Sequence, residues 1–212
     1  MGNRVPKQFI KLLDKPVLVH TLLTFDACDA VDDVIVVSPS ETMEETGFLL
    51  SEYGIEKVTQ VVVGGRERQD SVANALNCVP DHADIILVHD GVRPFITQDQ
   101  IQAVVNTALE YGAAILAVPS VNTLKRVDNC QVVATLDRSQ IWQVQTPQAF
   151  RFDWLREAYQ YAQESGLAVT DDAALVEAMG RVVRVVEGDN RNIKITSPLD
   201  LMIGEAILKD AV

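Results

Sequence analysis

The chain has 212 residues, of which 48% are hydrophobic, and 18 Lys and Arg against 30 Asp and Glu give a formal net charge of −12. This composition is typical of one globular domain and excludes disordered, collagen-like and low-complexity proteins. The acidic balance also argues against a nucleic-acid-binding protein, because such binding depends on a surplus of Lys and Arg. A small phosphorylated ligand is compatible with local basic clusters.

No apolar run approaches the ~20 residues that span a bilayer, and the start, MGNRVPKQF, lacks the apolar segment of a signal peptide. We therefore expect a cytoplasmic protein with no membrane partner. The three cysteines, Cys28, Cys78 and Cys130, lie 50 and 52 residues apart. This spacing fits neither a zinc site nor a redox pair, and it predicts free thiols.

Strands and helices alternate along the chain. A helix is expected at residues 16–25, and β-branched runs predict strands at 33–38, 57–63, 84–89 and 113–118. Between them, apolar residues with helical spacing occupy 72–79 and 101–109. Ser38-Pro39-Ser40-Glu41 and Ser197-Pro198-Leu199-Asp200 each combine a hydroxyl, a proline and an acid in the pattern of a helix start.

This alternation predicts an α/β fold with a doubly wound, mostly parallel, Rossmann-like sheet, whose ligand binds at the carboxyl ends of the strands. Residues 120–143 break the pattern. Two short runs at 124–127 and 132–136 flank Asp128-Asn129, which indicates a projecting β-arm. We expect residues 1–212 to form a single domain into which the arm, about 120–143, is inserted.

The segment Gly64-Gly65-Arg66-Glu67-Arg68-Gln69-Asp70-Ser71 follows a predicted strand and opens a predicted helix. Its glycines allow close approach of a ligand, and the helix N-terminus offers free N–H groups. A simple strand-to-helix turn would explain the glycines equally well. The arginines favour recognition of a phosphate or carboxylate.

The segment His89-Asp90-Gly91-Val92-Arg93-Pro94 follows the strand expected at the centre of the sheet. Asp90 is suited to ligate Mg²⁺, Gly91 leaves room for a nucleotide, and Arg93 can face an anion. The alternative is an aspartate that caps the next turn. His89 is interpreted as a core histidine.

Further polar segments are weak individually. A cation or hydroxyl of each could bind a second, phosphorylated substrate. The acid pair that follows Thr170 also suits the first turn of a helix. These segments are Pro6-Lys7-Gln8, Thr123 with Lys125-Arg126, Asp137-Arg138, Thr146-Pro147-Gln148, Thr170-Asp171-Asp172 and Asn192-Ile193-Lys194-Ile195-Thr196.

In order, PKQF, GGRERQDSV, HDGVRPF, VNTLKR, LDRSQIW, QTPQAF, TDDA and NIKIT resemble the 2-C-methyl-D-erythritol 4-phosphate cytidylyltransferase family across nearly the whole chain. The resemblance implies an α/β nucleotidyltransferase that uses Mg²⁺. It further implies that CTP and methylerythritol phosphate give the CDP-linked alcohol and pyrophosphate in non-mevalonate isoprenoid synthesis. The family also implies a homodimer formed through the arm.

The resemblance assigns roles by position. Lys7 matches a lysine that stabilises the transition state, and Asp90 the metal-linked acid. Arg138 and Lys194 match the cations that position methylerythritol phosphate, so these four are the expected catalytic residues. The cytidine site would comprise Gly65, Arg66, Ser71, Asp90 and Gly91. The alcohol phosphate would also contact Arg93, Thr123, Thr146 and Thr170, with Thr123 and Arg138 reaching a partner subunit's site.

Two departures stand out. The family's first strand and glycine-rich AAGxGxRM loop, with its arginine, precede the PKQ segment, and only Met1-Gly2 matches their end. We therefore expect a shortened start or a weakened enzyme, and a chain less stable than one extended at its N-terminus. Asn122 replaces an aspartate that is frequent in the family, which affects only the fine geometry of the substrate site.

Three other functions can be compared with this expectation. A cytidylyltransferase for ribitol 5-phosphate or another polyol phosphate would share this fold. A catalytically silent, truncated nucleotide-binding chain would fit the missing loop, although the other site residues are all present. A nicotinamide dehydrogenase is disfavoured, because the chain has no G-x-G-x-x-G motif.

Overall fold

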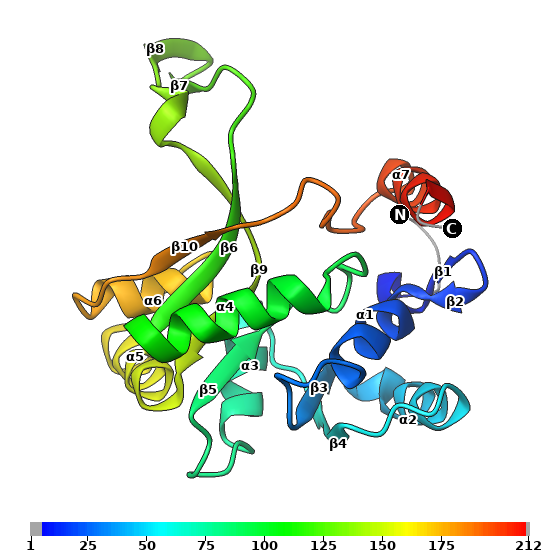
Figure 1. The fold of residues 1–212 in the computed structure, drawn as a ribbon. Coiled ribbons are helices and arrows are strands. Elements are labelled where there is room, and N and C mark those ends of the chain that lie inside the picture. Colours follow the sequence, from blue (N-terminus) through cyan, green and yellow to red (C-terminus); the bar gives the residue numbers. More distant parts are fainter. Residues whose placement is uncertain (1–5, 211–212) are drawn as a thin grey trace.

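Strands and helices alternate along most of the chain in the computed structural model, which describes residues 6–210 (Figure 1). No helix among these residues is long and apolar enough to cross a membrane. The helices are α1 (Val17–Asp26), α2 (Met43–Glu52), α3 (Arg68–Leu76), α4 (Gln98–Tyr111), α5 (Phe152–Ser165), α6 (Asp172–Ala178) and α7 (Pro198–Asp210), with the short 3-10 turns η1 (Lys7–Phe9), η2 (Ser40–Thr42) and η3 (Arg138–Gln140). The strands are β1 (Lys11–Leu12), β2 (Lys15–Pro16), β3 (Val34–Ser38), β4 (Val58–Val63), β5 (Ile85–Val88), β6 (Ala113–Pro119), β7 (Lys125–Asp128), β8 (Gln131–Thr135), β9 (Trp142–Arg151) and β10 (Arg184–Glu187).

The main sheet has four strands in the order β10-β6-β9-β5, and β3 and β4 form a separate parallel pair. Strand β9 runs antiparallel to both β5 and β6, whereas β10 is parallel to β6. The strands predicted at 33–38, 57–63, 84–89 and 113–118 are confirmed as β3 to β6. The doubly wound, mostly parallel sheet expected from the sequence is corrected in two respects: the chain leaves β6 through the arm and returns beside it as the antiparallel β9, and β3 and β4 lie outside the main sheet.

Helices cover both faces of the main sheet, and the alternation of side chains along β6 separates the two halves of the core. Ala113 and Ile115 pack with residues of α3, α5 and α6. Ala114 and Leu116 pack with residues of α1 and α4 on the opposite face. The result is a three-layer α/β arrangement in which every residue of β6 except Pro119 is buried.

One of the two predicted helix starts is confirmed. The Ser197 N–H donates to Asp200 (2.7 Å), and the Asp200 N–H donates to the Ser197 hydroxyl (3.2 Å), which caps α7. Ser38 instead ends strand β3, and its hydroxyl lies within hydrogen-bond distance of the Thr42 and Thr46 hydroxyls. The turn η2 therefore separates Ser38 from α2.

The arm extends from the ends of β6 and β9 as the hairpin β7-β8, away from the body of the molecule (Figure 1). Asn129 and Cys130, both at positive φ, form its turn. Val127, Val132 and Val133 are more than half exposed on it. Exposed valines on a thin hairpin are suited to an interface, so dimerisation through the arm stays a prediction.

Strands β3 and β5 each keep one edge without a hydrogen-bonded neighbour among residues 6–210, since β3 pairs with β4 and β5 with β9. These edges leave backbone N–H and C=O groups of β3 and β5 without a strand partner in the described part of the chain.

Candidate active site

A cavity of about 370 Å³ lies where β5 ends and where the first half of β9 crosses the carboxyl end of the main sheet. Open α/β sheets bind their ligands at this edge. Five of the expected site residues line it together: Asp90, Arg93, Thr146, Thr170 and Lys194. The remaining lining residues are Arg68, Val144, Gln145, Gln148 and Asp171.

Asp90 is the centre of charge in this cavity. One of its carboxylate oxygens, Oδ2, lies 3.1 Å from Lys194 Nζ and 3.2 Å from Arg93 Nε. The other, Oδ1, lies 3.6 Å from Arg68 Nε. Burial alone would raise the pKa of Asp90, but the charges of Lys194, Arg68 and Arg93 outweigh it and hold that pKa below its usual range. Asp90 is therefore ionised, and it holds three cationic side chains at the cavity, where they can contact an anionic ligand.

Arg68 joins this cluster to a second, buried acid. Its Nη2 donates to Asp172 Oδ2 at 2.7 Å, and Asp172 also accepts a hydrogen bond from the Tyr159 hydroxyl. The Asp172 side chain is 1% exposed. Burial and the neighbouring Asp172 raise the pKa of Tyr159, which keeps the phenol protonated and donating. Arg68 is thereby fixed between two carboxylates.

The glycine segment is shaped by close packing against α3. A Cβ on Gly65 would lie 2.2 Å from the Asp70 Cβ, so only glycine fits. The Gly65 N–H donates to the Ser71 hydroxyl (3.0 Å), which donates to the Glu67 carbonyl (3.1 Å). Gly65, exposed Arg66 and Ser71 do not line the cavity, whereas Arg68 of the same segment does.

The other expected residues lie apart from the cavity. Lys7 is the exposed first residue of η1, and Gly91 adjoins α1, where its carbonyl accepts from the Thr21 hydroxyl (3.1 Å). Thr123 and Arg138 are exposed on the arm, and Arg138 Nη1 donates to the Val121 carbonyl at 2.8 Å. A single chain therefore gathers only part of the predicted site.

Sequence reasoning missed Arg68 and two of the glutamines of β9, Gln145 and Gln148, as cavity residues, and it missed Asp172 as the anchor of Arg68. Gln148 donates to Asp171 Oδ2 (2.8 Å), and Gln145 donates to the Asp189 carbonyl (2.8 Å). Their signal in the sequence is the polar run in QTPQAF. Arg68 was visible only as the second arginine of the glycine segment.

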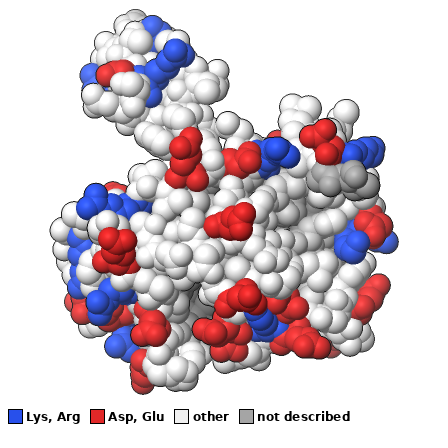
Figure 2. Space-filling view, viewed as in Figure 1, with Lys and Arg blue, Asp and Glu red and all other residues white. Residues whose placement is uncertain are grey.

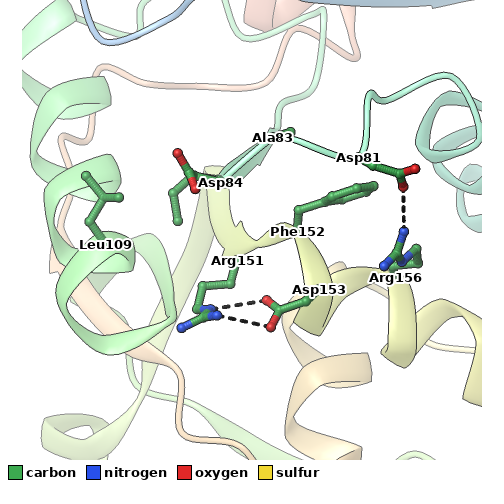
Figure 3. Close-up of a pocket in the computed structure, with 9 residues that line it drawn as sticks. Asp81, Ala83, Asp84, Leu109, Arg151, Phe152, Asp153 and Arg156 are labelled. Atoms are coloured by element: carbon green, nitrogen blue, oxygen red, sulfur yellow. Dashed lines mark hydrogen bonds and ion pairs between the residues drawn. The ribbon is translucent and has the colours of Figure 1, made fainter.

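A second cavity of about 380 Å³ lies at the opposite edge of the sheet, where β5 begins and β9 ends (Figure 3). Its arginines already face carboxylates: Arg151 pairs with Asp153 at 3.1 Å, and Arg156 with Asp81 at 3.0 Å. None of the expected site residues lines it.

Charged side chains are distributed differently over the body and the arm. On the face shown in Figure 2, Lys and Arg side chains are interspersed with Asp and Glu over the body and form no continuous basic stripe. The head of the arm shows more Lys and Arg than acidic atoms in this view. This face therefore lacks the continuous basic surface that a nucleic acid would need.

The three-layer α/β fold, with a cavity lined by three cationic side chains at the carboxyl ends of its strands, is typical of the nucleotide-binding α/β class and suits a small anionic ligand. Residues 1–210 match the family model described as 2-C-methyl-D-erythritol 4-phosphate cytidylyltransferase. The chain belongs to this family.

Curated relatives agree with this assignment. The 2-C-methyl-D-erythritol 4-phosphate cytidylyltransferase of Alkaliphilus metalliredigens is 46% identical over 210 residues, which cover 98% of this chain and 87% of that protein. The enzyme of the same name from Geobacillus thermodenitrificans is 45% identical, with coverage of 100% and 92%.

Solved structures place the fold in the same family. The crystal structure of 4-diphosphocytidyl-2C-methyl-D-erythritol synthase from Anaerococcus prevotii superposes with a TM-score of 0.89 at 29% identity, covering 98% of this chain and 92% of that one. The 2-C-methyl-D-erythritol 4-phosphate cytidylyltransferase from Thermus thermophilus gives a TM-score of 0.80 at 33% identity, with coverage of 96% and 94%.

Proposed function

We propose that the Asp90 cavity is where this cytidylyltransferase joins CTP to 2-C-methyl-D-erythritol 4-phosphate. A phosphate oxygen of the alcohol phosphate attacks the α-phosphorus of CTP, the bond to the β-phosphate breaks, and pyrophosphate leaves. The observation that carries the proposal is the cluster of Arg68, Arg93 and Lys194 around one ionised carboxylate. Such a transfer depends on positioning and charge compensation, which this cluster can provide.

The cavity supplies distinct contacts for the two substrates. Lys194 and Arg93 offer cations to the phosphate of the alcohol, and Thr146 and Thr170 line the same space. Gly65, Arg66, Ser71 and Gly91 would bind the cytidine, since the resemblance places them there. Lys7 would neutralise charge that develops on the α-phosphate during the attack.

A metal ion fits the donors present. No group of three or more His, Cys, Asp or Glu among residues 6–210 could hold an ion alone. Asp90 offers an ionised carboxylate, and Mg²⁺ commonly takes one or two carboxylates together with water and substrate phosphates. Asp90 would hold Mg²⁺, which when bound withdraws charge from the phosphate oxygens.

A homodimer would complete the site. Thr123 and Arg138 sit on the arm, outside the cavity of their own chain. An arm that extends away from the body can place their side chains at the cavity of a second copy. The exposed valines of β7 and β8 would be buried in the same contact.

The decisive experiment measures pyrophosphate release with CTP, Mg²⁺ and 2-C-methyl-D-erythritol 4-phosphate, and in parallel with ribitol 5-phosphate. We expect turnover with the methylerythritol phosphate, in this chain or in the N-terminally extended one. Preference for ribitol 5-phosphate would replace the proposed acceptor. CTP binding by calorimetry without turnover in either chain would show a silent nucleotide-binding protein.

Substitution of Lys194 and substitution of Lys7 should change different kinetic constants. Lys194→Ala removes a ground-state contact and should mainly raise KM for the alcohol phosphate. Lys7→Ala should lower kcat, because only Lys7 acts on charge that develops in the transition state. Lys209→Ala, at the exposed end of α7, is the matched control and should change neither constant. A kcat within twofold of the native value in Lys7→Ala would refute its role.

A further inference from the structure

His89 occupies the position between the end of β5 and Asp90, and both of its ring nitrogens are hydrogen-bonded. Nδ1 lies 3.0 Å from the Thr146 hydroxyl, and Nε2 lies 3.2 Å from the Arg93 carbonyl oxygen. The ring also packs on Phe25, with 4.9 Å between the ring centroids. The two polar partners, Thr146 and Arg93, both line the cavity.

The neighbouring donors and acceptors fix the proton on this ring. The Arg93 carbonyl can only accept, so Nε2 carries the proton and donates to it. The Thr146 oxygen accepts from the Asp90 N–H at 3.0 Å, and its own proton is then free to go to the unprotonated Nδ1.

Arg93 and Thr146 connect His89 to the cavity. Arg93, whose carbonyl is held by His89, directs its side chain to Asp90 (3.2 Å) and to the Asn192 carbonyl (2.9 Å). Thr146, whose hydroxyl is held by His89, is also held at its carbonyl by the Asn192 amide (3.0 Å). A histidine that merely filled the core would not need to join two cavity residues.

We propose that His89 is a positioning residue, which holds the Thr146 hydroxyl and the Arg93 main chain in the orientation that binds the alcohol phosphate. The inference rests on the proposed function, since it takes Thr146 and Arg93 as contacts of that substrate. His89 itself does not line the cavity and acts only through these two residues.

Two substitutions separate its two hydrogen bonds. The amide of His89→Asn lies near the position of Nδ1 and can still accept from Thr146, but it loses the bond to Arg93. The amide of His89→Gln lies near the position of Nε2 and can still donate to Arg93, but it loses the bond to Thr146. Each loss should raise KM for the alcohol phosphate about three- to tenfold, while KM for CTP stays within about twofold.

The exposed His82 provides the matched control, and His82→Gln should leave both Michaelis constants unchanged. Circular dichroism and the unfolding temperature show whether each variant is folded, and either of the two His89 variants suffices for the kinetic comparison. Equal rises in KM for both substrates, or no rise for either, would overturn the inference.

A double-mutant cycle tests the path through Thr146. Thr146→Val removes the hydroxyl that His89 holds. In the Thr146→Val background, His89→Gln should therefore raise KM for the alcohol phosphate by less than a further twofold. Fully additive effects on KM would overturn the proposed path.

Nuclear magnetic resonance separates this inference from the proposed function. If the native chain releases no pyrophosphate with any acceptor, the proposed function fails, and the ¹⁵N resonances of His89 still report its role in the network. We expect an unprotonated Nδ1 and a protonated Nε2, and a Thr146 amide resonance that moves in His89→Gln but not in His82→Gln. A protonated Nδ1, or a Thr146 amide that does not respond, would overturn the positioning role.

Discussion

Asp90→Asn should lower turnover by roughly 100-fold or more, which is the scale on which preorganised charge acts in such reactions. The substitution keeps the size of the side chain but leaves Arg68, Arg93 and Lys194 without their shared counter-charge. It also removes the carboxylate that would hold Mg²⁺. Pyrophosphate release under saturating substrates measures the loss.

Although Asp90→Asn should lower turnover, it should not weaken the binding of CTP when no metal is added. Removal of a negative charge from a cationic cavity favours an anion, so calorimetry without Mg²⁺ should show CTP binding at least as tightly to Asp90→Asn as to the native chain. Asp153→Asn in the other cavity is the control and should change neither turnover nor affinity. Turnover of Asp90→Asn within tenfold of the native chain would refute the assigned role.

Asp172→Ala should cost about 3 kcal/mol of stability and lower the unfolding temperature by about 10 °C. Asp172 is almost fully buried, and its removal leaves the Tyr159 hydroxyl and the Arg68 guanidinium without their partner. Breaking a buried pair by removing one member is costly for this reason. For a chain of this length, each kcal/mol shifts the midpoint by about 2–4 °C.

The neighbouring Asp171 provides a sharp comparison. Its carboxylate caps α6 by accepting from the Ala174 N–H (3.3 Å) and also accepts from the Gln148 amide (2.8 Å). Loss of the cap costs about 1 kcal/mol, and loss of the second hydrogen bond adds about as much. Thermal unfolding should therefore rank Asp172→Ala below Asp171→Ala. In a Tyr159→Phe background the cost of Asp172→Ala should shrink, because no buried hydroxyl is then left unpaired. The reverse ranking would contradict the buried network.

Elements with a strong local pattern were predictable. Strands β3 to β5 are short β-branched runs and β6 is a short apolar run, and α4 has apolar residues at helical spacing and a Thr97–Gln100 capping box. Strand β9 was not predictable. Its central residues Gln145, Thr146 and Gln148 are polar, and they are buried only because partners distant in sequence satisfy their hydrogen bonds.

The candidate site also contains residues that the sequence predicted and residues that only the structure shows. Asp90 was found because it follows a strand in an α/β pattern, and Arg93, Thr146, Thr170 and Lys194 were found through the motifs of the family. The cavity brings these residues together. Arg68 was not found, because its pairing with Asp172 joins residues 104 positions apart. His89 was read as a core residue, and only its two hydrogen bonds show what it holds.

The sequence by itself determined the α/β class, the family and most of the strands and helices, because periodicity, turn residues and motifs are properties of short segments. The tertiary structure decided the order of the strands, the antiparallel course of β9 and the separation of β3 and β4 from the main sheet. It also decided which cations surround Asp90. These features depend on contacts between distant segments, whose free energies no local pattern contains.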